Sequence, residues 1–497
     1  MSESATSSAV SQVGTDRAGQ AGGGVREAVL AGPGVVAGLD EDARSSLLER
    51  LVGRDAVRAA LASCGHVDVR RRVLPGEVTV NVVLGLGLFS GEGYDSVLAK
   101  VIPALSGPLP PGAGVPTGSA LSQARARVDE KVFHALFQAR AAEPERGPVV
   151  GACEFGLELT AYDGTLFDLA DTDAMREYFA TPTGGRHPQA RVVTLTACGT
   201  RKVRAAAVGS YATSEQELVD TLVEELTPGT LNLADRNFFS MARFLACAET
   251  GAQLAWRVKN SNQHLPAKVS ATLTDGSQLV ALHESDAMLA RRRRKAGTYS
   301  LPRLPDTIAR LVEFDLFVKD ERGRTRRSRF RILTTLLDHH TYPAKAIAAV
   351  YAQRWQAELA YYRLKVTLRG NGVVLRGQTP DLAKQEIWAL LCVYNTLCDL
   401  ATDTAVSLGL DPDQISFTAV LRLTRSHAAP TCACAAAPEA AQALRAAIAA
   451  HPTHRPGRQR TSPRTKKERP TERTRDVTYT INIVTSNLPK IDDDLLT

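Results

Sequence analysis

One stretch of the chain, "YAQRWQAELAYYRLK" at residues 351–365, carries side chains that could grip a phosphate backbone. Its polar residues Tyr351, Arg354, Glu358 and Lys365 lie at offsets 0, 3, 7 and 14. At about 100° of rotation per residue, an α-helix would place all four within roughly 60° of one another. At about 1.5 Å per residue the line is ~21 Å long, which suits nucleic-acid backbone better than a small molecule. The alternative is a solvated helix face with ordinary charge pairs.

Two aspartates earlier in the chain could add carboxylates to the same site. Asp163 in "YDGT" and Asp235 in "ADRNF" come where predicted strands end, and α/β folds place their sites at strand ends. A lone Asp at such a position is more often a turn former. Two strands that pair would bring these aspartates together, and a helix packed on the sheet could add Glu358.

Three converging carboxylates repel one another unless cations neutralise them. Hard oxygen ligands select Mg²⁺ or Mn²⁺. Two such ions about 3.5–4 Å apart stabilise the attacking and leaving oxygens of an in-line phosphoryl transfer. The pattern therefore predicts a polynucleotidyl transferase, in which Tyr351, Arg354 and Lys365 hold the substrate backbone.

The basic residues are clustered, which favours a polyanionic partner. The formal net charge is only +7 over 497 residues, but "RRRRK" occupies 291–295 and "RGRTRRSRFR" occupies 322–331. Residues 455–475 hold nine Lys or Arg against two Glu. Solubility is the alternative explanation for such runs.

Other features of the composition exclude several classes of protein. The eight cysteines form no pair of Cys-x-x-Cys motifs, so a zinc site is not expected, and dispersed thiols fit a reducing cytoplasm. The first 24 residues lack the apolar segment of a signal peptide. No run of 18 apolar residues suggests a membrane span. We therefore expect a cytoplasmic protein with no membrane partner.

The elements that must position the candidate residues differ between the two ends of the chain. Residues 1–38 are low in complexity and are expected to form a disordered tail. Residues 39–145 are helical in pattern, and 119–128 with 130–142 form a possible helix-turn-helix pair. This helical domain is expected to bind DNA, although it could equally be a packing module.

The pattern becomes mixed α/β near residue 150. Three strands, a helix, a strand, a helix and a strand are predicted up to residue 259, the first strand stopping at a turn after Asp163. We assign 146–259 and 336–427 to one catalytic core. Residues 260–335 form a basic, mostly β insertion with hairpin turns at Asp275-Gly276 and Gly323. Residues 428–497 are expected to be a basic, largely irregular tail that contributes little to the core.

These motifs resemble the insertion-sequence-4 family of bacterial DDE transposases. That family carries a Tyr-x2-Arg-x3-Glu-x6-Lys signature, which residues 351–365 match at every fixed position. The segments "DGT" and "DRNF" resemble its two Asp motifs, and "TTLLDHHTYPAKAIAAVYAQRW" and "LRGQTPDLAKQEIWALL" also resemble it. The resemblance covers roughly residues 40–405 and is weaker toward the N-terminus.

The resemblance implies an α/β fold: a ribonuclease-H-like mixed-sheet core with a β-rich insertion and an N-terminal helical domain. It implies that Asp163, Asp235 and Glu358 hold the metals. Metal-activated water would free a 3′-hydroxyl at the element end, and this hydroxyl would attack target DNA. The partners would be double-stranded DNA, both the terminal inverted repeats and the target, bound by a homodimer at the bacterial nucleoid.

In the best-studied relatives a hairpin forms on the DNA end, and an aromatic residue of the insertion stacks on a flipped base. Phe330, on the strand leading toward Glu358, is the candidate for that aromatic residue. Relatives carry a Trp there, and an ordinary core position for Phe330 is an equal alternative. Two other functions compete with an active transposase: an inactive relative that only binds DNA, and a structure-directed nuclease on the same core.

Overall fold

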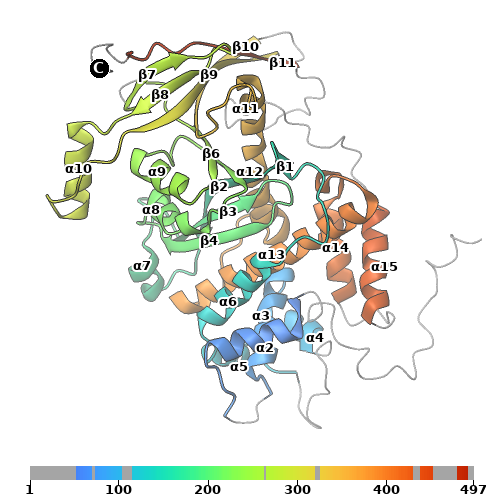
Figure 1. Cartoon of the computed structure of the whole chain (residues 1–497). Helices are drawn as coiled ribbons and strands as arrows, with labels where there is room; N and C mark the ends of the chain where they lie inside the picture. The colour runs from blue at the N-terminus through green and yellow to red at the C-terminus, as the bar shows by residue number, and fades with distance from the viewer. Residues whose placement is uncertain are drawn as a thin grey trace, which may run out of the picture. The chain divides into compact units, whose positions relative to one another are not determined.

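The computed structural model contains one mixed sheet, helices on both of its faces, and a helical region that precedes it (Figure 1). It describes residues 52–69, 73–102, 115–261, 265–319, 325–428, 437–451 and 478–490. The helices are α2 (Arg54–Ser63), α3 (Gly76–Leu88), α4 (Tyr94–Val101), α5 (Gly118–Arg125), α6 (Glu130–Ala142), α7 (Asp173–Phe179), α8 (Glu215–Asp220), α9 (Met241–Glu249), α10 (Asp286–Ala296), α11 (Ala344–Tyr351), α12 (Trp355–Tyr362), α13 (Pro380–Leu408), α14 (Phe417–Ala428) and α15 (Ala437–Ala449). The strands are β1 (Cys153–Glu154), β2 (Leu157–Asp168), β3 (Gln189–Ala197), β4 (Val203–Ser210), β5 (Thr230–Ala234), β6 (Gln253–Arg257), β7 (Ala267–Thr272), β8 (Gln278–Leu282), β9 (Thr307–Lys319), β10 (Thr325–Thr334) and β11 (Thr478–Ile483).

The first half of the sheet has the ribonuclease-H-like strand order. Its strands lie in the order β4-β3-β2-β5-β6. The pairs β2–β3 and β3–β4 are antiparallel, whereas β5 is parallel to β2 and β6 is parallel to β5. The expected α/β fold class is confirmed. β2 is the central strand of these five, with β3 and β4 on one side and β5 and β6 on the other.

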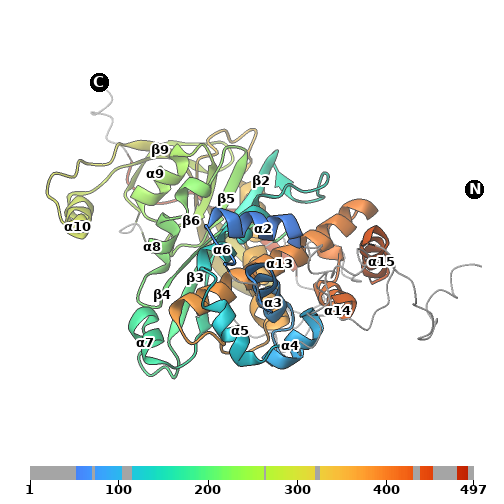
Figure 2. The same cartoon turned by 90° about the horizontal axis from the view of Figure 1, so that it is seen from below.

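The two faces of this half-sheet pack against different helices, as the two views of the chain show (Figures 1 and 2). Alternate residues of a strand point to opposite faces. In β2, Tyr162 belongs to a core cluster with residues of α8 and α9, while Leu159 and Ala161 belong to a cluster with residues of α11 and α12. The alternation in β2 therefore decides which side chains meet α12.

The insertion continues the sheet of the core. β10 pairs with β6, and β9, β8 and β7 follow in order. The hairpin turn predicted at Asp275-Gly276 is confirmed, with Gly276 at φ +86°, where a side chain would be strained. The turn predicted at Gly323 lies outside the described residues. The "RRRRK" run is not in a strand: it lies on α10, between a Ser285 cap and a left-handed Gly297.

Arginines of β10 pair with carboxylates of the neighbouring strand β9. Asp315 of β9 accepts hydrogen bonds from Arg327 at 2.6 Å and from Arg329 at 3.0 and 2.9 Å. Arg331, 1% exposed, lies 3.1 Å from Glu313. These pairs join neighbouring strands, because Arg329 is directly opposite Asp315 in the register. Much of this basic run therefore serves the sheet itself.

The expectation of a largely irregular C-terminal tail is wrong for the part that the structure describes. α15 contributes the fully buried Leu444 and Ile448 to the helical core. β11 pairs with β9 along the half that β8 leaves uncovered. The alternation in "TYTINI" is a strand pattern, so the signal was present at residues 478–483.

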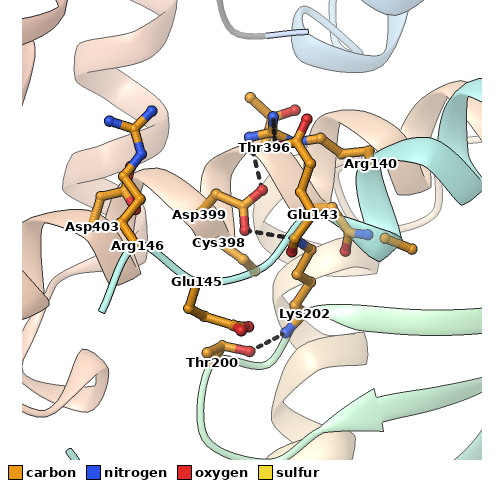
Figure 3. Close-up of polar contacts among 12 residues, drawn as sticks. Arg140, Glu143, Glu145, Arg146, Thr200, Lys202, Thr396, Cys398, Asp399 and Asp403 are labelled. Carbon is orange, nitrogen blue, oxygen red and sulfur yellow. Dashed lines mark hydrogen bonds and ion pairs between the residues drawn. The ribbon is translucent and has the colours of Figure 1, made fainter. Parts of the chain in front are cut away.

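The predicted helices at 119–128 and 130–142 are confirmed as α5 and α6, but α6 packs closely on α13. Trp388 of α13 donates to Glu130 at 3.0 Å and lies against the ring of His134, 4.4 Å between centroids. Asp399 of α13 pairs with Arg140 at 2.7 Å and with Lys202 of the β3–β4 turn at 3.1 Å (Figure 3). These contacts fit the packing alternative better than a recognition helix in a DNA groove.

Along the described segments, no helix is long and apolar enough to cross a membrane.

Candidate active site

Asp163 and Asp235 are neighbours on adjacent parallel strands. The last registered pair of β2 and β5 is Ala161 with Leu233, and both side chains lie in the core beneath α11 and α12. Two residues further on come Asp163, within β2, and Asp235, the first residue after β5. If the alternation continues for that one residue, both acids share this face, on strands about 4.8 Å apart. The structure thus brings together the two acids that the sequence pairs; their role as metal ligands stays a prediction.

The predicted turn after Asp163 is wrong. β2 continues to Asp168, because β3 pairs with it over its whole second half. Gly164 follows in extended conformation and points to the opposite face, where a Cβ would lie 2.7 Å from the Glu215 carboxylate of α8. A side chain here would displace the Glu215 carboxylate, which lies against the strand directly behind Asp163.

Burial raises the pKa of Asp163 to about 7. The Arg354 guanidinium and the Gly164 N–H, which donates to Asp163 Oδ1 at 3.0 Å, oppose this rise, whereas the nearby Glu358 charge adds to it. In the metal-free protein the carboxyl is therefore protonated in the acidic range and loses its proton only around neutral pH. A cation at this position would favour the charged form.

Asp235 presents an oxygen with spare hydrogen-bonding capacity. Its Oδ1 is buried and has no hydrogen-bond partner among the described residues. The closest cation is Arg257 of β6, whose Nη1 lies 3.7 Å from that oxygen, too far for a hydrogen bond. A buried oxygen in this state is suited to a further ligand.

The helix over residues 351–365 is continuous but is not wound evenly. α11 passes through a 3₁₀ turn at Ala352–Arg354 into α12, and a π-helical turn follows at Arg363–Leu368. The uniform rotation assumed from the sequence therefore fails at both ends of the stretch. The helix nevertheless runs along β2 and β5, because Tyr351 contacts Ala234 of β5 and Lys365 lies near Phe167 of β2.

Arg354 is the electrostatic centre of the site. It donates to Glu358 Oε1 at 2.5 Å. Burial works against its charge, but interactions with Tyr351, Glu358, Asp235 and Asp163, in that order, raise the pKa of Arg354 above its ordinary value. One guanidinium thus interacts with all three candidate acids.

Tyr351 and Lys365 lie at opposite ends of this region. Tyr351 is 3% exposed and donates to the carbonyl of Ala234, the residue before Asp235, at 3.3 Å. This burial contradicts the expected contact of Tyr351 with DNA and makes it a support for the β5 end. Lys365 Nζ lies 5.9 Å from the ring centroid of Phe167 in β2. Burial, together with the charge of the neighbouring Arg369, lowers the pKa of Lys365.

Phe330 belongs to the core. It is 1% exposed and stacks on Phe314 of β9, with 5.3 Å between centroids and 9° between planes. The guanidinium of Arg257 lies 4.2 Å from the ring centroid. Because both faces of the ring lie against other groups, the expected stacking on a flipped base is corrected to the core alternative.

The acids present fit a divalent cation. Within the described residues no three His, Cys, Asp or Glu side chains already form a metal cluster. Mg²⁺ nevertheless binds through one or two carboxylates together with waters and substrate phosphates. The paired Asp163 and Asp235, with the unsatisfied oxygen of Asp235, provide such a donor set of hard oxygens.

Two protein-family models match the chain. Insertion element 4 transposase N-terminal matches residues 43–138, and Transposase DDE domain matches residues 154–396. The chain belongs to the insertion-element-4 family of DDE transposases. The second match begins just before β2 and ends within α13, so it includes all three acids.

Two relatives from Escherichia coli agree with this assignment. The transposase resembles "Transposase InsG for insertion sequence element IS4" of Escherichia coli (strain K12), with 27% identity over 372 residues, 73% of this chain and 78% of the relative. "Putative transposase InsZ" of the same organism is 26% identical over 205 residues, 40% of this chain and 66% of the relative. A cryo-EM structure of the piggyBac transposase synaptic complex with hairpin DNA matches 82% of this chain and 85% of that chain, at 11% identity and a TM-score of 0.40.

Family membership establishes the coarse chemistry. The transposase acts on DNA, and its DDE domain depends on divalent metal ions. Two residues at the site escape the sequence pattern: Arg257 beside Asp235, and Tyr361, whose hydroxyl binds the carbonyl of Asp163. Only their position at the end of β6 and on the signature helix could have suggested them.

Proposed function

We propose that the transposase cleaves DNA at the ends of its insertion sequence and transfers the freed strands to target DNA, with Asp163, Asp235 and Glu358 as its catalytic acids. The register of β2 and β5 carries this proposal, because it sets the two aspartates side by side on the face covered by the helix of Glu358. Mg²⁺ or Mn²⁺, as two ions held by these acids, is the proposed cofactor. When bound, such ions stabilise the attacking and leaving oxygens of the transfer.

Arg354 has two tasks in this proposal. Without DNA it neutralises Glu358, to which it donates at 2.5 Å. When DNA is bound, its planar fork grips a backbone phosphate with two hydrogen bonds. Glu358 then turns its charge toward Asp163 and Asp235. Exchange of partners by one arginine thus couples the arrival of DNA to assembly of the three acids.

The signature residues at the ends of the helix act differently. Tyr351 holds the Ala234 carbonyl and so fixes the backbone that presents Asp235. Lys365 lies further along β2 and supplies a point charge to the DNA backbone beyond the cleaved phosphate. Phe330 has no part in DNA contact, so any hairpin step would need another aromatic residue.

Larger features complete the proposal. The transposase acts as a homodimer on the terminal inverted repeats and target DNA, at the bacterial nucleoid in the cytoplasm. Residues 39–145 form its helical domain, 146–259 and 336–427 its catalytic core, and 260–335 its basic insertion.

The proposal is tested with labelled duplex that carries the repeats bordering the gene, incubated with the full chain and Mg²⁺. Wild type should bind, cleave and join this DNA, and Asp235→Asn should bind it without cleaving. Binding alone by wild type would indicate an inactive relative, and cleavage without joining would indicate a nuclease. Normal cleavage by Asp235→Asn would refute the assigned acids.

A further inference from the structure

A chain of three hydroxyl groups joins the signature helix to the strand of Asp163. The hydroxyl of Tyr361 in α12 donates to the main-chain carbonyl of Asp163 at 2.8 Å. It also lies 2.9 Å from Thr194 Oγ1, which lies 3.0 Å from Thr196 Oγ1. A phenol has one hydrogen to donate. Because that hydrogen goes to the carbonyl, Thr194 donates to Tyr361, and Thr196 in turn donates to Thr194.

This chain meets the sheet at the level of the first acid. Thr194 of β3 is the direct cross-strand partner of Asp163, so both side chains lie on the face that α12 covers. Tyr361 is only 8% exposed, so water has little access to replace either hydrogen-bond partner of its hydroxyl.

Tyr361 also lies one helical turn beyond Glu358. Residues at i and i+3 share a helix face, so the turn of α12 that carries the third acid is the turn tied to Asp163. The winding changes to a π-helical turn immediately afterwards, at Arg363. The hydrogen bond of Tyr361 thus lies at the C-terminal end of α12, just before the helix changes to π-helical winding.

We propose that Tyr361 is a positioning residue that sets the distance between the strand of Asp163 and the helix of Glu358. This inference rests on the proposed role of those acids in catalysis. A catalytic group must be held within about 0.5 Å of its productive position, and a misplacement of about 1 Å can cost roughly 100-fold in rate. Without the hydroxyl, α12 would remain packed but would lose its fixed distance from β2.

A buried tyrosine could also serve stability alone, and the chain offers a matched control for that. Tyr394 of α13 is fully buried, and its hydroxyl donates to the carbonyl of Arg201 at 3.1 Å. Tyr361→Phe and Tyr394→Phe therefore remove the same kind of hydrogen bond, one at the acids and one in the helical core. A stability role would give both variants the same phenotype.

The experiment compares the two variants in the full chain, with the duplex that carries the bordering repeats. Both should bind this duplex within about twofold of wild type and lower the unfolding midpoint, since Tyr361→Phe loses its bonds to Asp163 and Thr194 and Tyr394→Phe loses its bond to Arg201. Single-turnover cleavage by Tyr361→Phe should fall between about 10- and 100-fold. The Mn²⁺ concentration for half-maximal thermal stabilisation should rise at least about threefold, because the acids are no longer held in place. Tyr394→Phe should match wild type in both measurements.

Two further variants separate the possible failures. Thr194→Val removes the donor to Tyr361 and the acceptor of Thr196 but leaves the bond from Tyr361 to Asp163. An intermediate loss of cleavage supports the directed chain, whereas a wild-type rate refutes it. If Glu358→Gln is inactive but Tyr361→Phe equals Tyr394→Phe in cleavage rate and in Mn²⁺ dependence, the positioning role is overturned and the proposed function stands. Normal cleavage by Glu358→Gln would instead overturn the proposed function itself.

Discussion

Replacing Asp163 by Asn should stabilise the metal-free protein at pH 8. Burial raises the pKa of this carboxyl from 3.8 to about 7. Each pKa unit corresponds to about 1.4 kcal/mol, so the folded surroundings as a whole disfavour the charged form by roughly 4 kcal/mol. The side chain keeps some solvent contact, which screens part of this penalty, and we expect a measured gain of roughly 1–3 kcal/mol. The amide has nearly the same shape and no charge to bury.

The pH dependence of this gain has a definite sign. Between pH 3.8 and about 7 the folded protein holds a proton on Asp163 that the unfolded chain has released. Stability therefore falls as the pH rises through this window and levels off above it. The advantage of Asp163→Asn should be near zero below pH 3.8, grow across the window and be greatest at pH 8.

Chemical denaturation in EDTA at several pH values between 4 and 8 measures this difference between variant and wild type. Asp315→Asn provides a control of opposite sign. Hydrogen bonds from Arg329 and then Arg327, against the effect of burial, lower the pKa of Asp315 to about 2. That variant should lose stability across the whole range from pH 4 to 8, and in added measurements below pH 3.8 the loss should fade as the pH falls toward 2.

Added Mn²⁺ extends the test to the metal. Saturation at 100 times the dissociation constant would stabilise wild type by about 2.7 kcal/mol, because the ion binds only the folded state. Mn²⁺ should stabilise Asp163→Asn much less than it stabilises wild type. A variant that is less stable than wild type at pH 8 in EDTA, or a difference that does not change with pH, would refute the reasoning from burial.

Three further outcomes are expected. Glu358→Gln should bind the bordering repeats with wild-type affinity in gel shifts but neither nick nor join them in Mg²⁺, because only the charge is lost; near-normal cleavage would mean that the helix is an ordinary charged face. Arg291→Gln combined with Arg294→Gln should weaken the salt dependence of DNA binding. The slope of log affinity against log salt concentration should change by about 0.9 for each lost phosphate contact. Arg329→Gln should leave this slope unchanged and lower the unfolding midpoint. Gly164→Ala should lower the unfolding midpoint slightly, since its Cβ would lie 2.7 Å from the Glu215 carboxylate, which pairs with Arg191; an unchanged midpoint would show that the Glu215 side chain turns aside without cost.

Local signals in the sequence predicted much of the fold. The turn at Asp275-Gly276 was predictable because one glycine supplies the positive φ that the hairpin needs. The helix α10 was missed because its basic run has little apolar periodicity and only Leu289 is buried. Its limits were still visible, since Ser285 caps its start and Gly297 ends it in the left-handed conformation.

Features that depend on tertiary packing could not be predicted in this way. The sequence "YDGT" resembles a strand followed by a turn, and only the continued pairing with β3 keeps Gly164 in the strand. Phe330 alternates with charged residues in a strand, so its side chain could face either solvent or core. Packing against β9, where Phe314 stacks on the ring of Phe330, places that side chain in the core.

The candidate site follows from strand register more than from any single motif. β2 and β5 stop pairing at Ala161 and Leu233, and because each acid comes two residues later, both face the same side as the last pair. A shift of one residue in either strand would turn its acid to the face of α8 and α9. On the correct face, Tyr351 and Tyr361 bind carbonyls of Ala234 and Asp163, one on each strand. The signature helix is therefore tied to the backbone at both acids, and Arg354 between these ties can reach all three carboxylates.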